Sequence, residues 1–196
     1  MYPQLPAKPT GRIIYITGRA IPQLFTGTTI AESGIMKSIV HQLNSLFIEK
    51  KLTLALAESV TCGLASHQLN IVKGTSDVFM GSIICYNEKV KIDLLKVKPS
   101  LIKKYTAESQ QVTDALARNL SRLIKADVYG AITGLNTDGG SETKSKPVGT
   151  VFLSILYKGK ITKARMLFRG SPLEIKKKAC EALYSLIIKR ISQSKQ

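Results

Sequence analysis

Apolar side chains recur along this chain at two spacings, one typical of helices and one typical of buried strands. Between residues 35 and 50 they return at every fourth position, which predicts an amphipathic helix. The same spacing predicts helices over 109–125 and after Ser171, which starts a capping box with Glu174. Two shorter helices are expected over 62–70 and 88–95.

Short apolar runs bounded by polar residues predict the strands. Three of them, 52–57, 82–86 and 128–133, have the length of buried strands. Two further runs, 150–157 and 162–168, flank a Lys-Gly dipeptide and predict a β-hairpin. Strands that alternate with helices in this order favour an α/β fold, a three-layer α/β/α sandwich with a mostly parallel sheet and an antiparallel edge.

The domain organisation follows from a change in composition. Residues 1–34 are rich in Pro, Gly and Thr, and we expect an N-terminal extension of uncertain order with one short strand at 11–17. Residues 35–196 have the length and the 44% hydrophobic content of the chain needed for one domain with a core. No apolar run has membrane-spanning length, and no signal peptide is evident, so a cytoplasmic location is expected.

The numbers and spacings of cysteine and histidine bear on whether the chain forms disulfide bonds or a metal site. The three cysteines, Cys62, Cys85 and Cys180, are odd in number and lack the spacing of metal-binding pairs, which favours reduced thiols. The two histidines, His41 and His67, have no other ligand type at metal spacing. We therefore expect no metal site, and nothing in the sequence indicates a cofactor.

The formal net charge of +16, from 29 Lys and Arg against 13 Asp and Glu, favours an anionic partner. The basic residues are spread along the chain, and each short lysine run alone is typical of a solvated helix face. Nucleic acid is the less favoured anion, because no basic strand rich in aromatic residues and no recognition-helix motif is present. A small phosphate-bearing molecule fits this pattern better.

A serine and a lysine follow two of the predicted strands. Ser59 lies two residues after the end of 52–57, and Lys91 lies five residues beyond 82–86. Because ligands bind at the carboxyl ends of strands in such sheets, the two side chains could meet there. A serine hydroxyl beside an uncharged amine can hydrolyse an amide without histidine, cysteine or metal. The alternatives are a helix N-cap for Ser59 and an exposed helical position for Lys91.

Further polar residues lie at the same predicted edge. Tyr86 could relay a proton or fix the amine, and Thr133 could orient the substrate or Lys91; the alternatives are an aromatic residue at a strand end and a turn-forming threonine. The segment Asp138–Ser141 contains two glycines whose bare amides could approach a phosphate, although Asp-Gly is also a common turn signal.

Together these blocks resemble the C-terminal domain of the competence/damage-inducible CinA proteins, the family of nicotinamide-nucleotide amidohydrolases. The similarity covers roughly Ile35 to Ile191. It rests on the order and spacing of Leu54–Ser59 followed by Thr61 and Gly63, Lys73–Ser76, Tyr86 with Lys91, Thr133–Gly134, Asp138–Ser141 and Lys146–Val151.

The resemblance implies hydrolysis of the carboxamide of nicotinamide mononucleotide to nicotinate mononucleotide and ammonia. It also implies that Ser59 is the nucleophile, that Lys91 is its base, and that Tyr86 and Thr133 support them. Family members tend to associate, so a homo-oligomer is expected. The implied substrate-binding residues, including the amides expected to hold the oxyanion, are Thr61, Gly63, Gly134, Asn136, Gly139 and Gly140.

The chain departs from the family pattern at four places, three of which fall around this implied substrate site. Cys62 replaces a glycine, and the loop at 135–137 is one residue shorter than usual. Pro172 stands in place of an arginine of the active site, and Gln110 in place of a glutamate. The alternative function is therefore a catalytically impaired member that binds a nucleotide or a protein.

Overall fold

The computed structural model describes residues 30–194, with side chains from residue 38 onward. The predicted strand at 11–17 lies outside the described residues, as does most of the predicted extension 1–34. Helix α1 spans Ile30–Lys50 and so begins at Ile30 rather than at residue 35.

Five strands form one sheet in the order β2-β1-β3-β4-β5. Strands β2, β1 and β3 are parallel, whereas β4 and β5 are antiparallel. The predicted α/β sandwich is confirmed, and its antiparallel part comprises two strands. The β4–β5 turn uses Lys158 and Gly159 with φ of 48° and 73°, the two positive values that tight hairpins need. The strands are β1 (Leu54–Glu58), β2 (Phe79–Ile84), β3 (Val128–Gly134), β4 (Thr150–Tyr157) and β5 (Lys160–Leu167).

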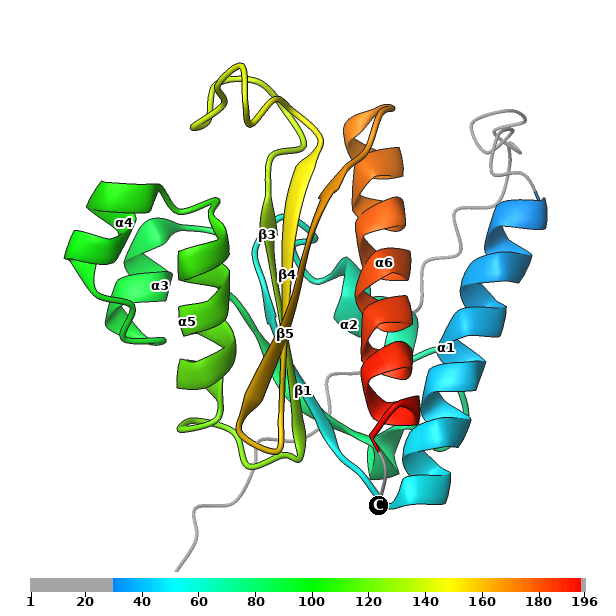
Figure 1. Cartoon of the computed structure of the whole chain (residues 1–196). Coiled ribbons are helices and arrows are strands. Elements are labelled where there is room, and N and C mark those ends of the chain that lie inside the picture. Colours follow the sequence, from blue (N-terminus) through cyan, green and yellow to red (C-terminus); the bar gives the residue numbers. More distant parts are fainter. Residues whose placement is uncertain (1–29, 195–196) are drawn as a thin grey trace, which may run out of the picture.

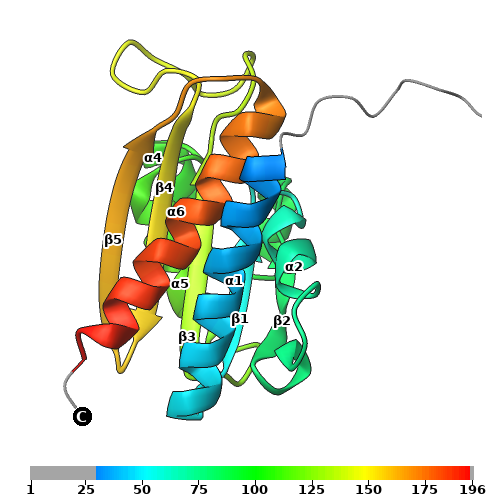
Figure 2. The ribbon, with the colours of Figure 1, turned by 90° about the vertical axis from the view of Figure 1, so that its right-hand side faces the viewer.

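Helices cover both faces of the sheet (Figure 1). Helices α1, α2 and α6 lie on one face, and α3, α4 and α5 lie on the other. Figure 2 shows α1 and α6 side by side across the sheet. The sequence patterns missed α4, which begins at a proline. The further bounds are α2 (Leu64–Leu69), α3 (Glu88–Asp93), α4 (Pro99–Tyr105), α5 (Gln110–Leu120) and α6 (Pro172–Ser192), with a short 3₁₀ turn at Thr75–Asp77.

Each face of the sheet has its own hydrophobic core. Side chains of α1 and α6, such as Phe47 and Tyr184, fill one side, and those of α5, such as Leu116 and Leu120, fill the other. Strands β1 and β4 are buried along their whole length, as expected where both faces of a sheet are covered. The Tyr184 hydroxyl donates a hydrogen bond to the Ala65 carbonyl at 2.6 Å, which fastens α6 to α2.

The helix ends explain most differences from the predicted bounds. Helix α2 begins at Leu64 rather than at residue 62, because Cys62 and Gly63 have left-handed backbones with φ of 50° and 91°. The predicted capping box at the start of α6 is present, with Ser171 and Glu174 bonded reciprocally. Strand β2 lies three residues earlier at its start than the apolar run at 82–86 suggested. Because β1, β2 and β3 are parallel, their carboxyl ends lie at the same end of the sheet.

Candidate active site

Ser59 lies at the carboxyl end of β1. Its backbone N–H donates to the Ile132 carbonyl at 3.0 Å, which keeps it in register beside β3. Because successive side chains along a strand alternate between faces, Ser59 and Glu58 point to opposite sides of the sheet. Ser59 faces the layer that contains α3 and α5, and it is buried apart from 4% of its surface.

Lys91 reaches Ser59 from helix α3. Its side chain is fully buried, and its Nζ lies 3.2 Å from Ser59 Oγ. The same nitrogen donates to the carbonyl oxygens of Cys85 at 2.7 Å and Tyr86 at 3.0 Å. A neutral amine has two hydrogens and one lone pair, so the two carbonyls take both hydrogens. As an ammonium, Lys91 donates its third hydrogen to Ser59 Oγ. In the neutral amine the lone pair would take that direction and could accept the serine proton, as a general base requires.

Burial lowers the pKa of Lys91 below its ordinary value. Cys85, Glu108 and Glu88 oppose this shift. The thiol of Cys85 contributes little at neutral pH, because its own burial raises its pKa to about 11 and keeps it uncharged. The side chain of Glu88 is exposed, which screens its charge. Desolvation therefore dominates and favours the uncharged amine.

Glu58 is a fully buried carboxylate to which sequence reasoning assigned no role. It accepts hydrogen bonds from the backbone N–H groups of Gly63 at 2.9 Å, Ala65 at 3.2 Å and Ser66 at 2.9 Å. The hydroxyls of Thr61 and Ser66 also donate to it. Glu58 thus replaces the missing side-chain cap of α2 and fixes the turn that carries Ser59. A glutamate ending an apolar strand just before a helix was the available signal.

The expected oxyanion donors need correction. The N–H of Gly63 and the hydroxyl of Thr61 are already bonded to Glu58, and the N–H of Cys62 donates to the Ser59 carbonyl at 3.2 Å. Within residues 30–194, the backbone N–H groups of Val60 and Thr61 donate to no acceptor. These two amides immediately follow Ser59 and are the ones free to bind a developing oxyanion.

The side chain of Cys62 is exposed, so the residue that replaces a family glycine points to solvent. Its positive φ is the feature that a glycine would supply without strain. The substitution therefore changes the backbone energetics of the turn more than the space beside Ser59.

Among described residues, the hydroxyls of Tyr86 and Thr133 make no hydrogen bond to Ser59 or Lys91. Tyr86 is 65% exposed, and the group that contacts Lys91 is its backbone carbonyl rather than its phenol. The hydroxyl of Thr133 is fully buried and lies 2.8 Å from that of Thr113 on α5. Because the Thr113 hydroxyl donates to the Ser109 carbonyl, Thr133 supplies the hydrogen in their mutual bond. Thr133 therefore holds α5 against β3, and no hydrogen bond joins it to Ser59 or Lys91 in the described structure.

The glycine loop also differs from the prediction. The N–H of Gly139 donates to Glu142 at 2.9 Å, so an internal carboxylate occupies an amide that the sequence assigned to a phosphate. Gly140 is exposed and Asn136 half-buried, and among described residues neither is hydrogen-bonded to Ser59 or Lys91. A Cβ on Gly134 would lie 2.6 Å from the Thr150 carbonyl oxygen, so this glycine allows close strand packing.

The described part of the chain contains no group of three or more His, Cys, Asp or Glu side chains able to hold a metal ion. Over the same residues, no helix combines the length and apolar character needed to cross a membrane.

Comparison with known sequences gives the relatives of this chain. The sequence model described as "CinA C-terminal domain" matches residues 36–191. A CinA-like protein of Pseudothermotoga lettingae is 36% identical over 145 residues, which cover 74% of this chain and 33% of that protein. A CinA-like protein of Thermotoga neapolitana is 39% identical over 125 residues, 64% of this chain and 30% of that protein. The chain matches about a third of the length of these relatives.

Solved structures share the fold. A crystal structure of a competence-damaged protein (CinA) superfamily protein from Enterobacter cloacae has a TM-score of 0.76 at 27% identity, covering 86% of this chain and 97% of that one. The competence/damage inducible protein CihA from Agrobacterium tumefaciens has a TM-score of 0.77 at 25% identity, covering 82% and 97%. The five-stranded sheet with helices on both faces is therefore an architecture that these proteins share.

Proposed function

Because the chain belongs to the CinA C-terminal domain family, we propose that it hydrolyses the carboxamide of nicotinamide mononucleotide, with Ser59 as nucleophile and Lys91 as base. One observation carries this proposal: the buried Nζ of Lys91 lies 3.2 Å from Ser59 Oγ and has both of its other directions filled by carbonyls. An ordinary surface lysine would be charged and solvated, and neither property suits it to deprotonate a serine.

Acylation proceeds in two proton transfers. Neutral Lys91 takes the Ser59 proton while Oγ forms a bond to the carboxamide carbon. The carbonyl oxygen becomes negative, and the N–H groups of Val60 and Thr61 stabilise it. When the C–N bond breaks, the Lys91 ammonium returns the proton to the leaving nitrogen. Ammonia departs and leaves an ester on Ser59.

Deacylation repeats the sequence with water. Lys91 takes a proton from water, whose oxygen bonds to the ester carbon. The bond to Ser59 Oγ then breaks, and Lys91 returns the proton to that oxygen. The products are nicotinate mononucleotide and ammonia, one water having been consumed. The same residue serves as base and then as acid in each half, so no metal or cofactor is part of the scheme.

Ammonia release from nicotinamide mononucleotide tests this function directly. We expect activity in the wild type and a loss of at least about 100-fold in Ser59→Ala and Lys91→Ala. The matched control is Lys89→Ala, which removes an exposed lysine of the same helix that pairs with Asp93 at 3.2 Å. It should retain the wild-type rate. Activity that survives either of the first two substitutions contradicts the proposed dyad.

A binding role without turnover is the second candidate, and one observation favours it. The position of the family arginine is Pro172, the first residue of α6 after its Ser171 N-cap. This chain therefore lacks a cation that family enzymes place near the substrate. Nicotinamide mononucleotide that binds to the wild type, Ser59→Ala and Lys91→Ala but yields ammonia in none of them supports this candidate and overturns the first.

Self-association is proposed through the free edge of β2. This strand has no charged residue, and Met80 and Ile84 on it are about half exposed. The other edge, β5, contains Lys160, Lys163 and Arg165, which disfavour pairing. Two copies of a chain with charge +16 would meet where charge is absent. Sedimentation equilibrium should show an oligomer that Ile84→Lys dissociates; a monomeric wild type contradicts this.

A further inference from the structure

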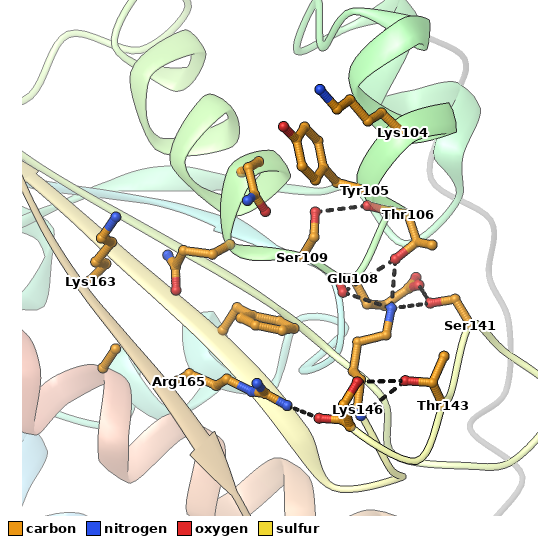
Figure 3. Close-up of a pocket in the computed structure, with 15 residues that line it drawn as sticks. Lys104, Tyr105, Thr106, Glu108, Ser109, Ser141, Thr143, Lys146, Lys163 and Arg165 are labelled. Carbon is orange, nitrogen blue, oxygen red and sulfur yellow. Dashed lines mark hydrogen bonds between the residues drawn. The ribbon is translucent and has the colours of Figure 1, made fainter.

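A second cavity, of about 650 Å³, lies apart from Ser59 and Lys91, neither of which lines it. Its walls come from the end of α4, the start of α5, the loop at 141–146 and the β4–β5 hairpin (Figure 3). Its volume is within the range of pockets that hold small molecules. Glu108 in its wall acts on Lys91 through space, but no reacting group of the proposed hydrolysis lines the cavity.

The charge of this cavity is strongly positive. Four cationic side chains line it, and a single carboxylate, Glu108, opposes them. Glu108 already accepts a hydrogen bond from the Ser141 hydroxyl at 2.5 Å. The four cations are Lys104, Lys146, Lys163 and Arg165. In the described part of the chain none of them forms an ion pair with a carboxylate, although Glu108 and Glu142 attract the charge of Lys146 through space.

Lys146 is a fixed part of the wall. Its Nζ donates to Thr106 Oγ1 at 2.6 Å, Ser141 Oγ at 2.8 Å and the Glu108 carbonyl at 3.1 Å, as the dashed lines in Figure 3 show. These three bonds use all of its ammonium hydrogens. Lys146 consequently contributes positive potential and rigidity to the cavity rather than a free donor.

Arg165 and Lys163 project from β5 on the opposite wall. The Arg165 guanidinium lies over the Phe152 ring, 5.6 Å from its centre, and donates to the Ser145 carbonyl. A guanidinium has five N–H donors, so most of them remain available. Within residues 30–194, Lys163 makes no hydrogen bond, and Lys104 contacts only the Tyr105 ring. Donors therefore face one space from two walls.

We propose that this cavity binds a polyphosphate group. Donors on separate walls exceed what one phosphate needs, and a chain of phosphates can reach both sides. A single carboxylate group has only two oxygens and cannot reach donors on both walls. The proposed ligand group is a linear polyphosphate, which could be inorganic or the phosphate chain of a nucleotide. The site does not depend on the proposed nucleophile and base, because neither Ser59 nor Lys91 lines it.

Calorimetric titration with inorganic tripolyphosphate, and separately with ATP, tests this site at fixed ionic strength. The double variant Lys163→Gln/Arg165→Gln removes two exposed cations of the cavity. The matched control, Arg122→Gln/Lys125→Gln, removes one arginine and one lysine that are exposed elsewhere. We expect saturable binding to the wild type, about tenfold or more weakening in the cavity variant, and at most about twofold in the control.

The outcomes separate the proposal from its rivals. Equal affinities for tripolyphosphate and ATP support recognition of the phosphate chain alone, and tighter ATP binding supports a nucleotide. Absence of saturable tripolyphosphate binding, or equal weakening in the control, overturns the proposal. Ser59→Ala should bind tripolyphosphate like the wild type, so inactivity toward nicotinamide mononucleotide leaves this test intact.

Discussion

The Nζ of Lys91 lies 3.2 Å from the Oγ of Ser59, although 32 residues separate the two in the chain. Each residue follows a strand of the parallel part of the sheet, and the strand ends bring them together. The carbonyls of Cys85 and Tyr86 then fix the amine by taking its two other directions. This arrangement costs the protein the solvation of a lysine, and that cost lowers the pKa of Lys91 and favours the uncharged amine, the form that can accept a proton.

The pH dependence of turnover follows from the lowered pKa of Lys91. The amine is active when unprotonated, so kcat/KM for nicotinamide mononucleotide should rise with pH through that lowered pKa and then level off. The midpoint should lie below the ordinary lysine value of about 10.4. A rate that is independent of pH from about 6 to 10 contradicts the role of Lys91 as base.

The free energy of unfolding should also depend on the protonation of Lys91. Because the pKa of Lys91 is lowered in the folded state, the unfolded chain binds more protons between that pKa and about 10.4. The free energy of unfolding therefore rises with pH in this window, by up to about 1.4 kcal/mol per pH unit. Below the folded-state pKa, Lys91 is charged in the folded protein and the full destabilisation by the buried charge is present.

Urea unfolding of wild type and Lys91→Met, followed below about pH 9, isolates this effect from the Cys85 thiol, whose pKa of about 11 lies higher. Lys91→Met should have a higher free energy of unfolding than the wild type. The difference should be largest at acid pH and become smaller as the pH rises. An advantage that is constant with pH contradicts a lowered pKa.

Glu58 should be among the most important polar groups for stability. Its removal in Glu58→Ala leaves the buried amides of α2 without an acceptor, at a cost of about 3–5 kcal/mol in the free energy of unfolding. Glu58→Gln keeps one side-chain oxygen that can accept hydrogen bonds, and its free energy of unfolding should fall by less. The comparison is Glu174→Ala, which removes the exposed carboxylate of the capping box at α6 and should cost much less. Equal losses at the two positions contradict this account.

The cysteines should differ in reactivity. Cys62 is exposed, whereas Cys85 and Cys180 are buried and burial raises the pKa of both thiols. An alkylating reagent at neutral pH should therefore modify Cys62 in the native protein and all three in urea. Mass spectrometry of the labelled peptides gives the result. Rapid native labelling of Cys85 indicates that the layer around Lys91 opens, contrary to the packing described.

Strand ends and their polar residues were predictable, because buried apolar runs and the edge rule of α/β sheets depend on local sequence. They placed Ser59 and Lys91 at one edge and gave the fold. The positions of backbone carbonyl and amide groups were not predictable, because the identities of the side chains do not determine the direction of a carbonyl in a loop. Tyr86 therefore entered the site through its carbonyl rather than its phenol.

The role of Glu58 was missed for a similar reason. A carboxylate in an apolar strand looks like the end of the strand, and its partners are amides that only the turn at 59–63 brings around it. Those bonds occupy the amide of Gly63, leave the expected amide of Thr61 available, and add that of Val60. The local sequence pattern thus located the candidate site, whereas hydrogen bonding among backbone atoms, which that pattern does not reveal, determines which amides are left available in it.

The protonation state of Lys91 is the most direct test. In protein labelled at lysine Cε, the chemical shift of the Lys91 carbon reports the charge on Nζ, and the resonance is assigned by its absence in Lys91→Arg. The account predicts that this carbon titrates well below about pH 10.4, apart from the exposed lysines. An Nζ that stays protonated until the surface lysines titrate contradicts it.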